Sequence, residues 1–120
     1  HYLDIGAEST RPGATPLTAE EEWRRLAPIL ELVPQWKKQF PFTQFSIDSY
    51  HPETAEKALE FKIDILNDVQ GLKSPRLREL AKEFSSVILM HSLVVPADPQ
   101  VTLPPETDVV AHLKNWFDQK

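Results

Sequence analysis

Polar side chains stand at the ends of four short apolar runs in this sequence. The runs end in Asp4, in Asp48, in Asn67 with Asp68, and in His91. In parallel α/β folds the loops that follow the strands gather at one edge of the sheet, and binding sites form there. Each residue alone has a plain alternative as a helix cap or a loop hydrogen-bonding group. Four at one edge indicate a polar pocket, because buried carboxylates and amides need partners.

Two of these residues suit the recognition of a flat heterocycle. An ionised Asp48 only accepts hydrogen bonds, whereas the amide of Asn67 both donates and accepts them. A ring that displays amino and ring N–H donors beside ring acceptors would satisfy both side chains. His91 leaves two roles open, a catalytic one and a hydrogen-bonding one at the end of its strand.

The segment from Glu8 to Ala14 reads Glu-Ser-Thr-Arg-Pro-Gly-Ala and adds groups that bind anions. Arg11 offers a planar fork that matches phosphate or carboxylate oxygens, and Thr10 offers a hydroxyl donor. Pro12 and Gly13 are a turn signal. The segment is not a Walker loop, because it lacks the Gly-Lys-Ser/Thr ending. A surface loop with an Arg–Glu ion pair is the alternative that these residues leave open.

The elements that position these side chains alternate in type. Short apolar runs alternate with amphipathic stretches, which predicts an α/β fold of β-α units around a parallel sheet. Strands are expected at residues 2–6, 45–49, 63–67 and 87–91. Helices are expected from 19 to about 38, from Pro52, from Pro75 and over 106–118. The last strand is apolar enough to be covered on both faces.

Several details of the helices follow from single residues. Thr18 and Glu21 form a capping box. Pro28 lies inside the first helix, where we expect a kink in a single helix rather than two short helices. The last helix is expected to turn Val109, Val110, Leu113 and Phe117 inward. His51 and His112 have no companions at ligand spacing, so we expect a cap residue and a helix-surface residue.

Composition excludes several classes of protein. The 120 residues carry a net charge of −5 and no cysteine, which excludes disulfides, thiolate zinc sites and a cysteine nucleophile. An acidic balance argues against nucleic-acid binding. No apolar stretch is long enough to span a membrane, and no secretory signal is present, so we expect a cytoplasmic location.

The residues quoted above resemble dihydropteroate synthase, a pterin-binding TIM-barrel family. The run Asp4-Ile-Gly-Ala-Glu-Ser-Thr-Arg-Pro-Gly-Ala14 is similar to the family's signature for the second strand and its loop. Ser46-Ile-Asp-Ser49, Leu66-Asn-Asp-Val69 and Leu89-Met-His91 are similar to its next strand ends, in the same order. The resemblance implies strands two to five of a partial (β/α)₈ barrel, formed by residues 1–120 as a single segment.

The resemblance also implies a reaction in folate biosynthesis. This transferase family, the target of sulfonamides, condenses 6-hydroxymethyl-7,8-dihydropterin diphosphate with p-aminobenzoate, and magnesium assists departure of the diphosphate. By resemblance, Asp48, Asn67 and Met90 bind the pterin. The loop residues Ser9, Thr10, Arg11 and Pro12 organise p-aminobenzoate and diphosphate, and among them Thr10 and Arg11 act in catalysis.

Several segments of the family pattern are absent from this sequence. The family's first strand, with its magnesium ligand, and strands six to eight have no counterpart, so no metal ligand is assigned within residues 1–120. Half a barrel leaves two open sheet edges, which favours self-association or poor solubility. We therefore expect a longer polypeptide, homodimeric or fused to a pterin diphosphokinase, and no activity from this chain alone. A folate-dependent methyltransferase and a non-catalytic pterin-binding fragment are the alternatives.

Overall fold

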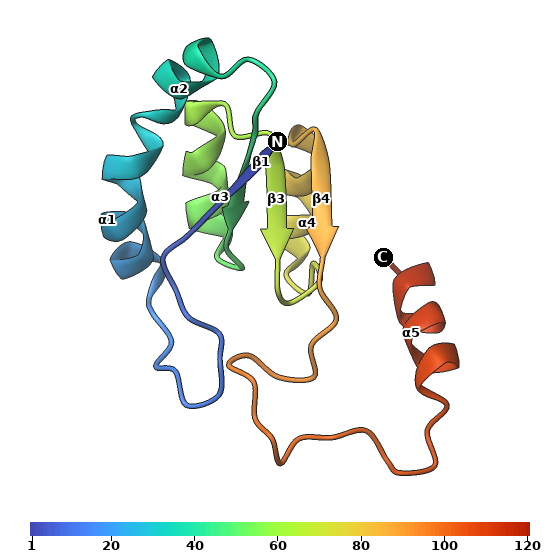
Figure 1. The fold of residues 1–120 in the computed structure, drawn as a ribbon. Helices are drawn as coiled ribbons and strands as arrows, with labels where there is room; N and C mark the ends of the chain where they lie inside the picture. Colours follow the sequence, from blue (N-terminus) through green and yellow to red (C-terminus); the bar gives the residue numbers. More distant parts are fainter.

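The computed structural model describes residues 1–120 and is built around a parallel sheet of four strands (Figure 1). The strands lie side by side in the order of the sequence: β1 (Tyr2–Gly6), β2 (Gln44–Asp48), β3 (Ile65–Asp68) and β4 (Ser86–Leu89). Each strand is laid beside the one before it, as in a (β/α) barrel, whereas a doubly wound sheet reverses its strand order. The strands all point the same way in Figure 1, so their following loops meet at one end.

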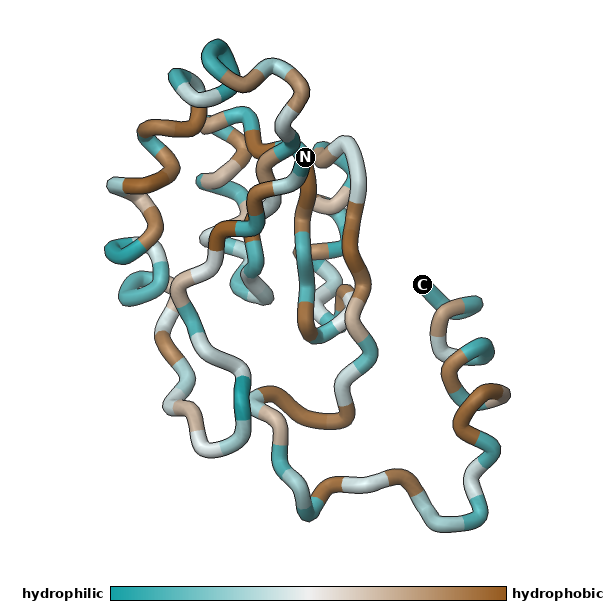
Figure 2. The backbone as a smooth tube through the Cα atoms, viewed as in Figure 1, coloured by the Kyte–Doolittle hydropathy of each residue, from teal (hydrophilic) through white to brown (hydrophobic).

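Successive side chains along each strand point to opposite faces of the sheet, and helices cover only one of these faces. Phe45, Ile47 and Leu66 are buried and form the core with apolar residues of the helices. Figure 2 shows hydrophobic segments running through the strands and the helices beside them. The opposite face is open and hollowed by about 380 Å³, between Tyr2, Asp4, Gln44, Ser46, Ile65, Ser86 and Ile88. This face corresponds to the interior of a barrel.

The first helical stretch is two helices rather than one kinked helix. α1 spans Ala19–Leu30 and α2 spans Val33–Gln39. The prediction of one helix with a kink at Pro28 was wrong, because α1 continues through that residue to Leu30 and a second helix follows. Pro34, in the first turn of α2, has no N–H to bond the carbonyl of Leu30 and would crowd it, so α1 ends there. The predicted capping box is confirmed, with Glu21 N donating to Thr18 Oγ1 at 3.2 Å and Thr18 N to Glu21 Oε2 at 2.9 Å.

Two further helices cover the same face of the sheet and end in short 3₁₀ turns. α3 spans Pro52–Ala58 and is followed by a turn at Leu59–Phe61. α4 spans Pro75–Leu80 and is followed by a turn at Ala81–Glu83. Both begin with proline at the first helical position, where its missing N–H costs least. α3 packs between α1 and α4, which gives one continuous helical layer.

The fourth strand is covered on one face only. Ile88 and Met90 each keep 47% of their surface exposed. The expectation of cover on both faces was wrong for this chain, because no segment of it lies over the open face of the sheet. No helix combines the length and apolar character needed to cross a membrane.

The last helix, α5 (Val109–Asp118), follows a long loop and stands apart from the helical layer (Figure 1). Val109, Val110 and Phe117 are exposed, so the prediction that they face inward was wrong. Leu113 is half-buried, and His112 and Trp116 contact His91. A Cβ on Gly71 would lie 2.2 Å from the indole of Trp116, and Gly71 also has a φ of +60°.

The Gly71→Ala variant should therefore displace Trp116. A left-handed backbone costs a non-glycine residue about 1 kcal/mol, and the methyl group cannot fit beneath the indole. In the ¹H–¹⁵N spectrum of the chain, the indole signal of Trp116 should move, while those of Trp23 and Trp36 stay in place. Trp116→Ala assigns the signal. An unchanged Trp116 signal in Gly71→Ala would contradict this packing of α5.

Candidate functional site

The candidate site lies at the carboxyl ends of the strands, where Gly6, Asp48 and Asn67 are neighbours in register. Asn67 Nδ2 donates to Asp4 Oδ2 at 3.0 Å. This bond leaves the amide oxygen of Asn67 free to accept. The carboxylate of Asp48 is half-buried and forms no hydrogen bond of its own. The two residues predicted to bind a heterocycle are therefore adjacent, and both retain acceptor oxygens.

The electrostatics of this edge are dominated by carboxyl groups. Burial is the largest of the causes that raise the pKa of Asp48 from its ordinary 3.8 to about 6, and the negative charges of nearby carboxyl groups add to it, in the order Asp4, Glu22, Asp68 and Glu8. At neutral pH Asp48 is still ionised, in surroundings that favour its neutral form. Such a carboxylate gains from a ligand that offers N–H donors.

Asp68 has a different role from its neighbour Asn67. Its side chain is fully buried, and its two oxygens accept from Gln70 N at 2.8 Å and Leu72 N at 2.6 Å. Burial raises the pKa of Asp68, while these two backbone bonds oppose the rise. Asp68 thus shapes the turn between β3 and α4 and is not available to a ligand. The alternative of a loop hydrogen-bonding role, which the sequence left open for each strand-end residue, therefore applies to Asp68.

The loop after β1 turns at Pro12 and Gly13, where Ala14 N donates to Arg11 O at 3.1 Å. Arg11 is exposed and forms no ion pair, so the alternative of an Arg–Glu pair is not what the structure shows. Arg11 instead lines a depression of about 650 Å³, together with Ser9, Pro12 and Arg25. Two guanidinium groups therefore border the same space.

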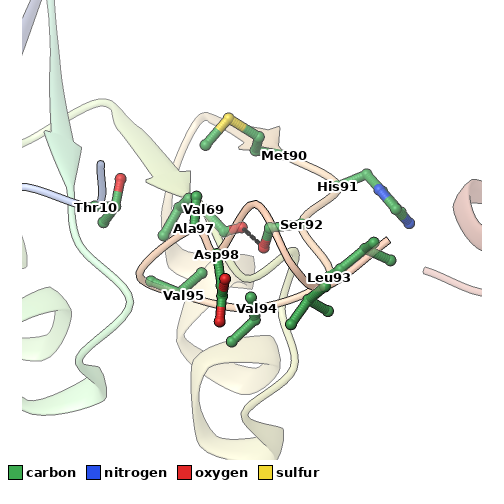
Figure 3. Close-up of a pocket in the computed structure, with 11 residues that line it drawn as sticks. Thr10, Val69, Met90, His91, Ser92, Leu93, Val94, Val95, Ala97 and Asp98 are labelled. Carbon is green, nitrogen blue, oxygen red and sulfur yellow. Dashed lines mark hydrogen bonds between the residues drawn. The ribbon is translucent and has the colours of Figure 1, made fainter. Parts of the chain in front are cut away.

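Thr10 and Met90 line a second pocket, of about 310 Å³ (Figure 3). The loop after β4 closes its floor, where Ser92 Oγ donates to Val69 O at 2.6 Å. Ala97 N donates to Thr10 O at 3.0 Å, which joins this loop to the loop after β1. Thr10 and Met90 thus line one pocket and Arg11 lines another. Asp48 and Asn67 line neither of them.

His91 belongs to a small aromatic cluster behind the strand ends. Its Nε2 lies 3.1 Å from Nε2 of His112, so one ring donates and the other accepts, and Trp116 packs edge-on against His91. The hydrogen-bonding role considered for His91 is therefore observed. The prediction of a helix-surface role for His112 was wrong, because α5 turns this side chain toward β4.

One cluster was missed by sequence reasoning. Carboxylate oxygens of Glu8 and Glu22 and a ring nitrogen of His51 lie within 4.8 Å of one another. His51 does occupy the cap position of α3, but its side chain contacts Glu8 instead of the helix. A signal for the cluster existed in the sequence: Glu22 precedes Leu26 and Leu30 by four and eight residues, so it lies on the apolar stripe of α1.

Comparison with known proteins assigns the chain to a family. The model of the pterin binding enzyme family matches residues 1–120, so the chain belongs to that family. Its four parallel strands and their helices are consecutive units of the family's TIM barrel, which confirms the predicted fold class.

Relatives of known name include dihydropteroate synthases. A dihydropteroate synthase from Escherichia coli is 34% identical over 116 residues, which are 96% of this chain and 39% of that protein. A bifunctional dihydropteroate synthase/dihydropteroate reductase from Helicobacter pylori is 42% identical over 99 residues, which are 82% of this chain and 26% of that protein. The chain therefore spans less than half the length of these relatives.

Solved structures agree with this assignment. The dihydropteroate synthase from Anaplasma phagocytophilum with bound 6-hydroxymethylpterin-monophosphate superposes with a TM-score of 0.82 at 33% identity, over 98% of this chain and 47% of that one. The enzyme from Thermus thermophilus in complex with 4-aminobenzoate gives a TM-score of 0.79 at 39% identity, over 98% of this chain and 43% of that one.

Replacing Asp48 with asparagine should stabilise the fold at neutral pH but not in acid. The folded-state pKa of about 6 exceeds the ordinary 3.8, so the contribution of Asp48 to stability is complete below about pH 4 and is lost as the pH rises through 6. Above pH 6 the native chain bears the cost of a half-buried charge that Asp48→Asn avoids. Because partial exposure screens that charge, we expect a gain on the order of 1 kcal/mol at pH 7.5 and almost none at pH 4.

Urea unfolding at the two pH values measures this difference. Glu60→Gln is the control, since Glu60 is exposed and forms no hydrogen bond or ion pair through its side chain. It should change stability equally little at both values. An effect of Asp48→Asn that does not depend on pH would show that the charge of Asp48 is not disfavoured in the fold.

Proposed function

We propose that residues 1–120 form the pterin-binding and p-aminobenzoate-binding part of a dihydropteroate synthase. The observation that carries this proposal is the pairing of Asp48 and Asn67 at the strand ends, with the Asp48 carboxylate free of any protein partner. The names of the relatives support it, and so does the pterin monophosphate in the Anaplasma phagocytophilum enzyme. The reaction joins 6-hydroxymethyl-7,8-dihydropterin diphosphate to p-aminobenzoate.

In this proposal Asp48 and Asn67 read the edge of the pterin. Asp48, ionised above about pH 6, accepts from the amino and ring N–H donors. Asn67 keeps its amide orientation through Asp4 and accepts with its free oxygen. Charge-assisted hydrogen bonds of this kind are about twice as strong as neutral ones, which gives Asp48 the larger share of affinity. Met90, at the side of the neighbouring pocket, supplies an apolar contact to the ring.

The loop after β1 handles the two anionic groups. Arg11 offers two parallel N–H donors to the carboxylate of p-aminobenzoate or to diphosphate oxygens, and Thr10 adds a hydroxyl. Departure of diphosphate leaves a cation at the pterin methylene that the amine of p-aminobenzoate attacks. Little acid–base chemistry is needed, so positioning and stabilisation of the leaving group's charge supply most of the rate. The Yersinia pestis enzyme was solved with a sulfonamide drug, and we propose that such compounds compete for the p-aminobenzoate position here.

Magnesium is implied by the family, and the residues of this chain do not fit it. The only converging group of potential ligands is Glu8, Glu22 and His51. Magnesium favours oxygen ligands and retains several waters. This group is largely buried and includes an imidazole, and its carboxylates already contact His51, Ser49 and Tyr50. We propose that the metal ligand lies outside residues 1–120, and no step is assigned to the ion here.

A complete barrel tests the function directly. Residues 1–120 can replace the matching segment of the Escherichia coli relative, which aligns over 96% of this chain. We expect the chimera to release diphosphate and form dihydropteroate, whereas the 120-residue chain alone should form no product. A folded chimera that binds pterin without turnover would favour the non-catalytic alternative. Product from the isolated chain would overturn the expectation that the segment is inactive alone.

Two substitutions in that barrel separate the proposed roles. Asp48→Ala should weaken pterin binding roughly 100-fold or more, because at least two hydrogen bonds to a charged group are lost. Calorimetric titration with the pterin substrate measures it, and Glu60→Gln should leave the affinity unchanged. Unaltered affinity in Asp48→Ala would show that the pterin binds elsewhere.

Arg11→Ala should act on turnover instead. Removal of a donor to the leaving group or to p-aminobenzoate should lower kcat/KM by roughly 100-fold, and pterin affinity should stay within about twofold. Steady-state kinetics with each substrate varied in turn measures this split. Arg24→Ala, in α1 and outside the lining of the loop depression, is the matched control. A loss of pterin affinity in Arg11→Ala would contradict the division of roles between loop and strand ends.

A further inference from the structure

Glu8 attaches the base of the loop after β1 to residues that follow β2. Only 3% of its side chain is exposed. The hydroxyl of Tyr50 donates to Oε1, and Nε2 of His51 lies 3.0 Å from Oε2. Both carboxylate oxygens are thus occupied by residues that follow β2. The pKa of Tyr50 is raised by burial and by Glu8, which keeps the phenol protonated as a donor.

A second carboxyl group lies behind this pair. Glu22 of α1 is fully buried, and its Oε2 accepts from Ser49 Oγ at 2.8 Å while Oε1 has no hydrogen-bond partner. Burial raises the pKa of Glu22, which favours its neutral form. Ser49 Oγ also accepts from His51 N at 3.1 Å. Within the group of Glu8, Glu22 and His51, the contact between Glu8 and His51 is the direct hydrogen bond.

This cluster lies between the two parts of the candidate site. Glu8 precedes Thr10 by two residues and Arg11 by three, while Ser49 directly follows Asp48. The side chains of Glu8 and His51 are nearly buried, and neither lines a pocket beside the loop or the strand ends. A group in that position does not reach substrate. What it does is set the distance between the base of the loop and the end of β2.

We propose that the Glu8–His51 pair is a positioning device that holds Thr10 and Arg11 in place relative to Asp48. The proposal rests on the proposed synthase function for its kinetic consequence. Its structural part, attachment of the loop, is independent of that function. The pair acts through the loop, so its loss should affect the use of p-aminobenzoate more than the binding of pterin.

Kinetics in the complete barrel provide the first test. His51→Gln removes the imidazole whose Nε2 contacts Glu8 and puts a more flexible side chain in its place. We expect a loss of roughly tenfold or more in kcat/KM for p-aminobenzoate, as for misplaced catalytic groups, with pterin affinity within about twofold. His51→Lys places an ammonium group beside the carboxylate of Glu8 and should recover most of the loss. The double variant Glu8→Gln/His51→Gln should be no worse than either single variant, because both remove the same interaction. Glu60→Gln is the control and should behave as the parent, since Glu60 is exposed and forms no side-chain hydrogen bond.

Hydrogen exchange provides a second test that does not depend on activity. In His51→Gln the backbone amides of residues 7–17 should exchange several-fold faster than in the parent barrel, while those of β2 and α3 should be unchanged. If the barrel proved inactive but this change appeared, the proposed function would fail and the attachment would stand. Unchanged exchange and unchanged kinetics in His51→Gln would overturn the positioning role. A general loss of structure would also overturn this role. Its signs would be equal losses of pterin affinity and p-aminobenzoate use, together with a lower unfolding midpoint.

Discussion

Parallel pairing of consecutive strands is the constraint from which the other features of this chain follow. β1 to β4 run in the same direction and in the order of the sequence, so every residue that ends a strand lies at one edge. Helices that return the chain to the start of the next strand cover one face only, and the other face stays open. A site at one edge and an uncovered inner face are therefore two consequences of the same pairing.

The strand ends at this edge bring several carboxyl groups close together. Hydrogen bonds within the chain stabilise most of these groups. Asp68 is held by backbone N–H groups, and Asp4 by the amide of Asn67. Glu8 is held by Tyr50 and His51. Asp48 has no hydrogen-bonding partner, and its pKa is raised by burial and by the negative charges around it. An isolated carboxylate amid others that are satisfied is the expected state of a group reserved for a cationic or N–H-rich ligand.

The loops after β1 and β4 connect the edge to its surroundings in different ways. The first is attached at its base through the buried carboxylate of Glu8, and beyond that point only a turn at Pro12–Gly13 and one bond to Ala97 shape it. The second leads to α5, which returns to the strand ends through His112 and Trp116. Rigid anchors beside exposed loop tips are suited to a reaction in which two substrates must be brought together.

The sequence by itself determined the alternation of strands and helices and the four polar strand ends, and it predicted which of these residues would bind a heterocycle. These follow from local rules: residues two apart share a face of a strand, and proline and capping residues start helices. The predictions from sequence were wrong where contacts with residues distant in the sequence decided the structure. Pro28 was accommodated within α1, whereas Pro34 ended it; Val109 and Val110 stayed exposed because no segment of the chain lies against them.

Only the tertiary structure decided which polar residues are free and which are used internally. Asp48 and Asp68 look equivalent as strand-end aspartates, yet one faces the open edge and the other is enclosed by a turn. Likewise Glu8, Glu22 and His51 are separated by up to 43 residues and meet within a few ångströms. Such contacts depend on how β1, α1 and α3 pack together, and no local pattern along the chain encodes that packing.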